Sequence, residues 1–289
     1  MASAPHDLAP WTLGTRTFAW GDRTYVMGIL NVTPDSFSDG GTHGTVEAAL
    51  SHARRMLADG ADLIDVGGES TRPGSLAVSA EEERERVVPV IRALRAETDA
   101  AISIDTCKAE VADAALSAGA HLVNDISGLE QPAMRRAIAR HKAAGVAMHM
   151  QGTPRTMQQA PRYDDVVAEV RAYLGARLAQ ARSEGLDRVA VDPGIGFGKT
   201  LDQNLALLRH LPVFRMLGAP VLLGTSRKGF IGHLLDLPVD QRVEGTMATV
   251  ALAVRDGVDI VRVHDVREAV RTVRVADAVV RGAKGGTLG

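Results

Sequence analysis

The sequence has only one cysteine, Cys107, in 289 residues. A single cysteine excludes an intrachain disulfide and a cysteine-cluster zinc site, and it is typical of the reducing cytoplasm. Aromatic residues make up 3% of the chain, and no apolar run reaches the roughly 20 residues that a membrane helix needs. The start, MASAPHDLAPW, lacks the basic and apolar segments of a secretion signal. We therefore expect a cytoplasmic protein that does not associate with a membrane.

The chain also lacks an excess of either charge. Lys and Arg number 33 against 35 Asp and Glu, so the composition gives no reason to expect a nucleic acid partner, and any anion site must be local. Apolar residues at 45% are sufficient for a core. The length allows one large domain or two. We predict one domain over residues 1–289, with flexible ends at 1–10 and 283–289.

Eight short apolar runs end in polar residues. They are TYVMGILN (24–31), ADLIDVGG (61–68), AAISIDT (100–106), HLVNDIS (121–127), GVAMHM (145–150), RVAVDPG (188–194), PVLLGTS (220–226) and VDIVRVHDV (258–266). Near-continuous apolar character is what a parallel strand buried on both faces requires. Helical patterns lie between runs, at 45–59, 79–98, 164–184 and 267–281, the second opening with Ser79 and Glu82 in capping-box spacing.

This alternation predicts an α/β fold, a (β/α)8 TIM barrel. The rival is an open doubly wound sheet, but its G-x-G-x-x-G signature after the first strand is missing. Residues 15–26, RTFAWGDRTYVM, predict an N-terminal β-hairpin that turns at Gly21 and Asp22 and caps the bottom of the barrel.

The predicted strands deliver polar side chains to one rim, because the carboxyl ends of barrel strands form the active-site face. These positions are Asn31, Glu69, Asp105, Asn124, Asp125, His149, Asp192, Ser226, Arg262 and His264. A basic cluster suited to a phosphate or diphosphate is expected from Arg262 and His264 together with the loop residues Arg72, Arg227 and Lys228. The carboxylates suggest a ligand with an amidine-like edge of adjacent N–H donors.

Three stretches have competing interpretations. DPGIGFGKT (192–200) resembles a P-loop, but Pro193 stands where that motif needs glycine, so we favour a loop whose glycines let the backbone approach a flat ligand. Cys107 has no evident base partner and is interpreted as a packing residue. His149 is as consistent with a hydrogen-bonded strand end as with a ligand.

Taken together, these motifs resemble one family, the dihydropteroate synthases among the pterin-binding barrels. The resemblance runs from MGILNVTPDSFSDGG through DVGGESTRPG, SIDT, NDIS, MHMQGTP, DPGIGFGK and GTSRKGF to RVHDV. It implies a transferase of folate biosynthesis that condenses 6-hydroxymethyl-7,8-dihydropterin diphosphate with 4-aminobenzoate and releases diphosphate. It also implies Mg²⁺ as cofactor and a homodimer.

The resemblance assigns roles residue by residue. Asn31 is implied as the Mg²⁺ ligand. Implied contacts to the pterin diphosphate are Thr71, Asp105, Asn124, Met148, Asp192, Lys228, Arg262 and His264; those on the aminobenzoate side are Phe37, Arg72, Pro73, Phe197 and Ser226. The residues implied in catalysis are Asp35, Asp105, Asp192, Lys228, Arg262 and His264. The segments 32–41 and 70–76 are expected to act as lids.

The residue types and the resemblance suggest an SN1-like reaction, in which diphosphate leaves before the amine attacks. Two rivals are a pterin-barrel methyltransferase, which would not need the basic cluster, and an inactive paralogue, expected to show a damaged lid or a lost anion ligand.

Overall fold

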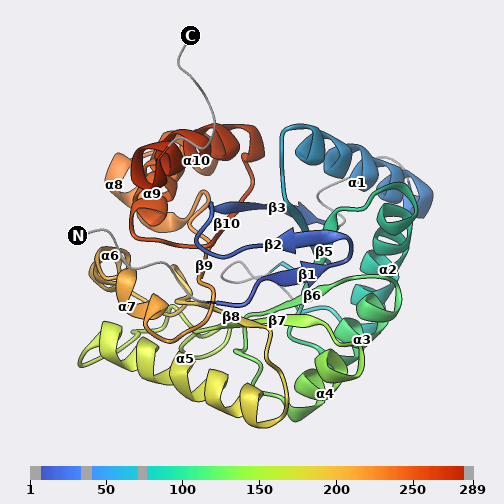
Figure 1. The fold of residues 1–289 in the computed structure, drawn as a ribbon, viewed down its shortest axis with the longest axis horizontal. Coiled ribbons are helices and arrows are strands. Elements are labelled where there is room, and N and C mark those ends of the chain that lie inside the picture. Colours follow the sequence, from blue (N-terminus) through green and yellow to red (C-terminus); the bar gives the residue numbers. More distant parts are fainter. Residues whose placement is uncertain (1–7, 34–40, 71–76, 283–289) are drawn as a thin grey trace.

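The computed structural model describes residues 8–33, 41–70 and 77–282. Within them eight parallel strands form the main sheet, in the order β8-β7-β6-β5-β4-β3-β10-β9. The strands are β3 (Tyr25–Asn31), β4 (Leu63–Gly67), β5 (Ala101–Asp105), β6 (Leu122–Asp125), β7 (Ala144–Met148), β8 (Val189–Asp192), β9 (Leu222–Leu223) and β10 (Ile260–Val263). A parallel bridge between Val191 and Val221 joins the sheet's two ends. The predicted TIM barrel is confirmed (Figure 1).

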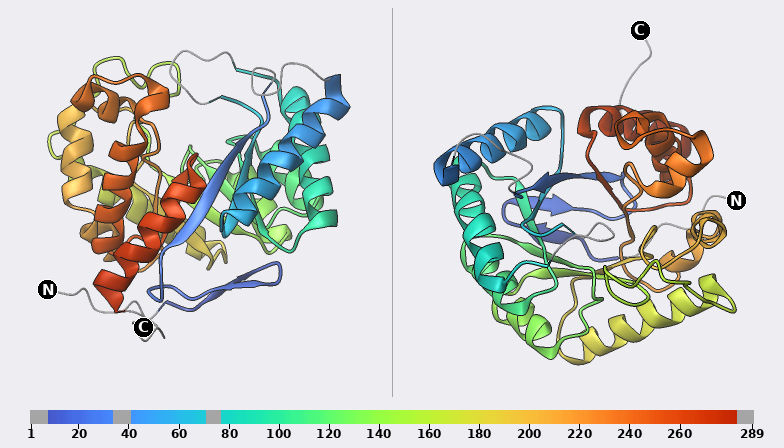
Figure 2. Two further views of the ribbon diagram at one scale, coloured as in Figure 1. Left: turned by 90° about the horizontal axis from the view of Figure 1, so that it is seen from above. Right: turned by 180° about the vertical axis from the view of Figure 1, so that it is seen from behind.

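Helices surround the barrel in chain order (Figures 1 and 2). They are α1 (Gly41–Ala58), α2 (Ala80–Glu97), α3 (Ala109–Ser117), α4 (Pro132–Arg140), α5 (Val166–Ser183), α6 (Leu201–Arg209), α7 (Pro212–Arg215), α8 (Gly229–Leu235), α9 (Val243–Arg255) and α10 (Val266–Arg281), with a 3-10 turn at Val239–Gln241. As the capping-box spacing predicts, Ser79 Oγ accepts a hydrogen bond from the Glu82 N–H at 3.1 Å. The helix continues through Pro89.

The N-terminal hairpin exists, but the predicted position of its turn is wrong. Strands β1 (Trp11–Leu13) and β2 (Arg16–Phe18) pair antiparallel around Gly14, which has φ +64°, and not around Gly21 and Asp22. The turn lies earlier because Trp11, Leu13 and Phe18 are buried and hold both strands against the barrel. In the left view of Figure 2 the hairpin crosses the bottom of the barrel, so the predicted cap is confirmed.

The barrel strands alternate between two apolar layers. On β4, Ile64 and Val66 join the layer between sheet and helices, whereas Leu63 faces the barrel interior with the hairpin residues Trp11 and Phe18. The lower interior is thus closed by apolar side chains. Of the predicted flexible ends, 1–7 and 283–289 lie outside the described residues, and Leu8 packs against the lower layer.

Candidate active site

A row of site residues crosses four adjacent strands at the carboxyl end of the barrel. Asn31 pairs with Gly67, Gly67 with Asp105, and Asp105 with Asn124. Gly67 has no side chain, and a Cβ there would lie 3.6 Å from the Asp105 Cβ and 3.8 Å from the Asn31 Oδ1. Because Gly67 has no side chain, the space between Asn31 and Asp105 stays open, and both residues can contact one ligand there.

Arg262 reaches this row from β10. Its Nε donates to Asp65 Oδ2 at 2.6 Å, and its Nη2 donates to Asp105 Oδ2 at 2.5 Å. Asp65 Oδ2 also accepts from Asn124 Nδ2 at 3.0 Å. The sequence interpretation missed Asp65. Its signal was an acidic residue inside the apolar run ADLIDVGG, two positions before Gly67 and so on the same face of the strand.

The two predicted carboxylates of the site have perturbed acidities. Burial is the largest influence on the pKa of Asp105 and raises it, while the charge of Arg262 lowers it and the charge of Asp65 raises it. The resulting pKa is about 7. Burial also raises the pKa of Asp192, opposed by the charge of Lys228. Asp192 Oδ1 accepts the backbone N–H of Gly194 at 2.7 Å, which fixes the carboxylate at the base of the glycine loop.

Lys228 connects the two predicted halves of the site. Burial lowers the pKa of its ammonium group to about 8, although the nearby charge of Asp192 opposes this. Its Nζ donates to the carbonyl of Ile195 and lies 4.6 Å from the centre of the Phe197 ring. The lysine therefore lies between Asp192, expected on the pterin side, and Phe197, expected on the aminobenzoate side.

Ser226 and His264 form a second contact between neighbouring strand ends. Ser226 Oγ accepts the backbone N–H of His264 at 3.0 Å and lies 2.9 Å from its ring Nδ1. The resemblance implies Ser226 for aminobenzoate and His264 for diphosphate. The geometry adds a role for Ser226 in orienting the His264 ring.

The loop DPGIGFGKT is held from inside. Lys199 is buried, and its Nζ lies 3.1 Å from Nδ1 of His149 and donates to the carbonyls of Gly194 at 2.9 Å and Phe197 at 2.7 Å. An ammonium group engaged in this way does not face a nucleotide phosphate, which removes the P-loop alternative. His149 is a hydrogen-bonded strand end, and Met148 is buried beside it.

Two other residues do not serve as reactive groups. Arg227, expected in the basic cluster, instead forms an ion pair with Asp265 at 2.5 Å. Within the described residues, the cluster available to an anion therefore has one member fewer than expected. Burial raises the pKa of the Cys107 thiol to about 11, which agrees with a packing residue and not a nucleophile.

Asp35, Phe37, Thr71, Arg72 and Pro73 lie outside the described residues, as does most of both predicted lids.

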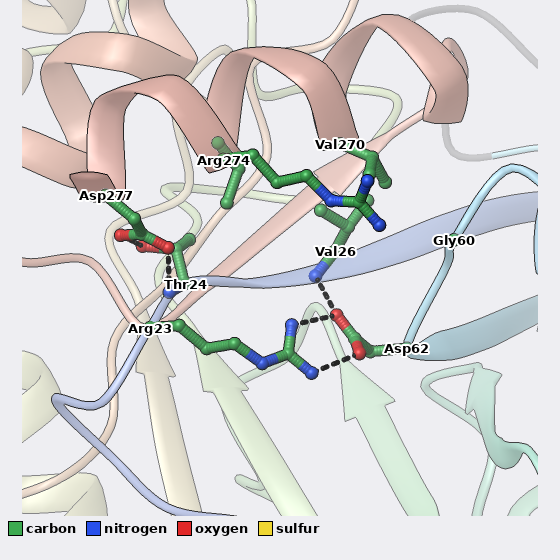
Figure 3. Close-up of a pocket in the computed structure, with 9 residues that line it drawn as sticks. Arg23, Thr24, Val26, Gly60, Asp62, Val270, Arg274 and Asp277 are labelled. Carbon is green, nitrogen blue, oxygen red and sulfur yellow. Dashed lines mark hydrogen bonds and ion pairs between the residues drawn. The ribbon is translucent and has the colours of Figure 1, made fainter. Parts of the chain in front are cut away.

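A cavity of about 320 Å³ lies at the opposite end of the barrel, between the start of β3 and the end of α10 (Figure 3). Two of its charged residues, Arg23 and Asp62, form an ion pair. Arg23 donates to both oxygens of Asp62 at 2.9 and 2.6 Å, and the backbone N–H of Thr24 donates to Asp277 at 2.9 Å. These contacts fasten the last helix and the hairpin end to the barrel, away from the polar rim.

Comparison with known proteins agrees with this geometry. The family model described as "Pterin binding enzyme" matches residues 27–264. The dihydropteroate synthase of Synechocystis sp. is 51% identical over 94% of this chain and 96% of its own length. The dihydropteroate synthase of Xanthomonas albilineans with 4-aminobenzoic acid is 48% identical, with a TM-score of 0.87 over 93% of this chain and 97% of that one. Its complex with 7,8-dihydropteroate is 46% identical, with a TM-score of 0.85 over 94% and 98%. The chain belongs to the dihydropteroate synthase family of pterin-binding enzymes.

Proposed function

We propose that the chain condenses 6-hydroxymethyl-7,8-dihydropterin diphosphate with 4-aminobenzoate to give 7,8-dihydropteroate and diphosphate, in the cytoplasm. The observation that carries the proposal is one hydrogen-bonded network at the rim where Asp192 and Lys228 also lie. In it Arg262 donates to both Asp65 and Asp105, and Asn124 donates to Asp65. Carboxylates and an amide suit the N–H-rich edge of a pterin, and a guanidinium suits a diphosphate. The Xanthomonas albilineans complexes with 4-aminobenzoic acid and 7,8-dihydropteroate support the same pair of ligands.

The chemistry that these residues support is SN1-like. The bond between the pterin methylene carbon and the diphosphate oxygen breaks, and its electron pair leaves with the diphosphate. Arg262 and His264 stabilise the developing negative charge, while Asp105 and Asp192, with Asp35, stabilise the methylene cation. The amine of 4-aminobenzoate then forms the new C–N bond and releases one proton. No protein nucleophile is needed in this scheme.

The donor set at the rim fits Mg²⁺ bound mainly by its substrate. Asn31 presents a side-chain oxygen beside the open space over Gly67. No group of three or more His, Cys, Asp or Glu side chains in the described ranges could hold a metal by itself. Mg²⁺ prefers oxygen ligands and usually takes one or two from protein and others from phosphates and water. Asn31 would hold the ion, which when bound neutralises charge on the departing diphosphate.

The direct test is incubation of the purified chain with the pterin diphosphate, 4-aminobenzoate and Mg²⁺, with dihydropteroate detected by mass spectrometry. Arg262→Ala should lower turnover about 100-fold or more, because it removes a charged donor from the departing anion. Arg23→Ala, which removes an arginine of the opposite cavity, is the matched control and should retain turnover. A folded wild-type protein that forms no dihydropteroate would leave the inactive paralogue as the better account.

We also propose that the chain forms a homodimer through α8, α9 and α10, which lie side by side (Figure 1). Large apolar side chains are exposed there: Leu234, Leu235, Leu252, Val275, Val279 and Val280. An exposed apolar patch that spans adjacent helices marks an interaction surface. Val279→Asp should yield a monomer in sedimentation velocity, whereas Met216→Asp, at an exposed apolar residue after α7, should leave the dimer intact.

No described helix is long and apolar enough to cross a membrane.

A further inference from the structure

Asp65 is a buried acid of the site that has no role of its own in the proposed reaction. Its side chain is fully buried, whereas those of Asp105 and Arg262 are 11% and 20% exposed at the rim. Asp65 therefore lies beneath the residues that can reach a ligand. It cannot touch substrate itself, and any effect on the reaction must pass through its neighbours.

Stability does not explain why an acid stands at this position. Asp65 Oδ1 is buried and has no hydrogen-bond partner within the described part of the chain. A buried carboxylate with one oxygen unpaired destabilises the folded state, and an apolar residue of similar volume is often as stable as a buried ion pair. The strand neighbour Ser103, paired with Asp65 in the sheet, is likewise buried with an unpaired Oγ. The pattern is that of a site built for function.

The contacts of Asp65 set the orientation of two other residues. Its Oδ2 accepts from Arg262 Nε at 2.6 Å and from Asn124 Nδ2 at 3.0 Å. Because a carboxylate only accepts, Asn124 must turn its NH₂ group toward Asp65, which leaves the amide oxygen for another donor. Because Nε and Nη2 of Arg262 are held by Asp65 and Asp105, the Nη1 group is left for an anion.

We infer that Asp65 is a positioning residue, which fixes the Arg262 guanidinium and the Asn124 amide in the orientations that bind the pterin diphosphate. The inference rests on the proposed function, since it names the substrate half that these two residues serve. Holding a site from beneath in this way reduces the freedom that binding must otherwise remove, and a displacement of about 1 Å can lower a rate about 100-fold.

Two substitutions separate positioning from general loosening of the barrel. Asp65→Leu removes both contacts, and Asp65→Asn keeps an oxygen that can accept from Arg262. We expect kcat/KM for the pterin diphosphate to fall about 100-fold in Asp65→Leu and about 10-fold in Asp65→Asn, with KM for 4-aminobenzoate unchanged in both. Equal loss in KM for both substrates would mean a structural role and overturn the inference.

The matched control is Asp62→Asn. Asp62 is also a buried acid of the barrel paired with an arginine, Arg23, but at the opposite end. This variant should lose stability and keep both KM values. If it shows the same kinetic split as Asp65→Asn, the inference is wrong.

A measurement without turnover distinguishes failure of this inference from failure of the proposed function. In protein labelled with ¹⁵N-arginine, the Arg262 Nε–H resonance is assigned by its absence in Arg262→Lys. It should exchange slowly with water in the wild type and fast in Asp65→Leu. If the wild type makes no dihydropteroate, the proposed function fails, and the exchange rates still decide for or against Asp65. Unchanged slow exchange in Asp65→Leu would refute the positioning role.

Discussion

The ammonium group of Lys199 lies 3.1 Å from Nδ1 of His149, where the glycine loop after β8 passes the end of β7. Burial, together with the charge of Lys199, lowers the pKa of His149 to about 3, so the imidazole is neutral and its Nδ1 accepts. The same Nζ donates to the carbonyls of Gly194 and Phe197. Lys199 is thus an internal clamp for the loop that carries Phe197.

Lys199→Met should remove this clamp while keeping the volume of the side chain. We expect the free energy of unfolding to fall by about 1–3 kcal/mol, the usual effect of leaving buried acceptors unpaired, together with a higher KM for 4-aminobenzoate. Urea denaturation and steady-state kinetics measure the two effects. Lys142→Met, at an exposed lysine, is the control, and equal stability of the two variants would contradict the clamp.

The pH dependence of kcat/KM should be bell-shaped. Asp105 has a pKa raised to about 7 and must be ionised to stabilise the cation, so the rate rises as pH increases through about 7. Lys228 has a pKa lowered to about 8 and must be protonated, so the rate falls above about 8. Asp105→Asn should remove the ascending limb and Lys228→Arg the descending one. A profile that is flat between pH 6 and 9 would rule out both roles.

Gly194→Ala should be more destabilising than its backbone conformation alone explains. Gly194 has φ +67°, and a Cβ there would lie 1.9 Å from the carbonyl oxygen of His149. Gly218 has the same φ of +67° but nothing within 4 Å. Gly218→Ala should therefore lower the unfolding free energy by about 1–2 kcal/mol, and Gly194→Ala by a further 1–3 kcal/mol. Thermal unfolding of both variants measures the difference between the two losses. Equal losses would mean that the loop moves to accept the Cβ and would contradict the prediction.

Ser226→Ala should affect the pterin diphosphate more than 4-aminobenzoate. The substitution removes the oxygen that accepts the His264 N–H and contacts its ring, and we expect kcat/KM for the diphosphate substrate to fall about 3- to 10-fold. Thr225→Val removes the neighbouring hydroxyl, which contacts Thr249 instead, and should have little kinetic effect. A change confined to KM for 4-aminobenzoate would return Ser226 to the role that the resemblance implies.

Removal of metal should stop the reaction reversibly. We expect EDTA to abolish dihydropteroate formation and added Mg²⁺ to restore it. Asn31→Ala should raise the Mg²⁺ concentration needed for half-maximal rate about 10-fold, because one oxygen ligand is lost. Arg23→Ala, at the opposite end of the barrel, is the control. If Asn31→Ala shows an unaltered Mg²⁺ requirement, Asn31 does not bind the ion.

Local patterning was sufficient for the barrel. Runs such as ADLIDVGG are too apolar for any strand but one buried on both faces, and Ser79 with Glu82 marks a helix start wherever the chain folds. The hairpin turn was misplaced because Gly14 and Gly21 are equally able to turn a chain. The choice between them depends on the burial of Trp11 and Phe18 under the barrel, which is a contact with distant strands.

The sequence alone determined which residue types end each strand, because the period of the apolar runs fixes where a strand stops and which face each side chain takes. Only the tertiary structure decided which of the charged residues pair with one another and which remain available to a ligand. Arg227 is neutralised by Asp265 and Lys199 is enclosed by carbonyls, whereas Arg262 extends to Asp65 and Asp105, respectively 197 and 157 positions away. Pairing of charges depends on distances of a few ångströms between groups far apart in the chain, and strand spacing carries no such information.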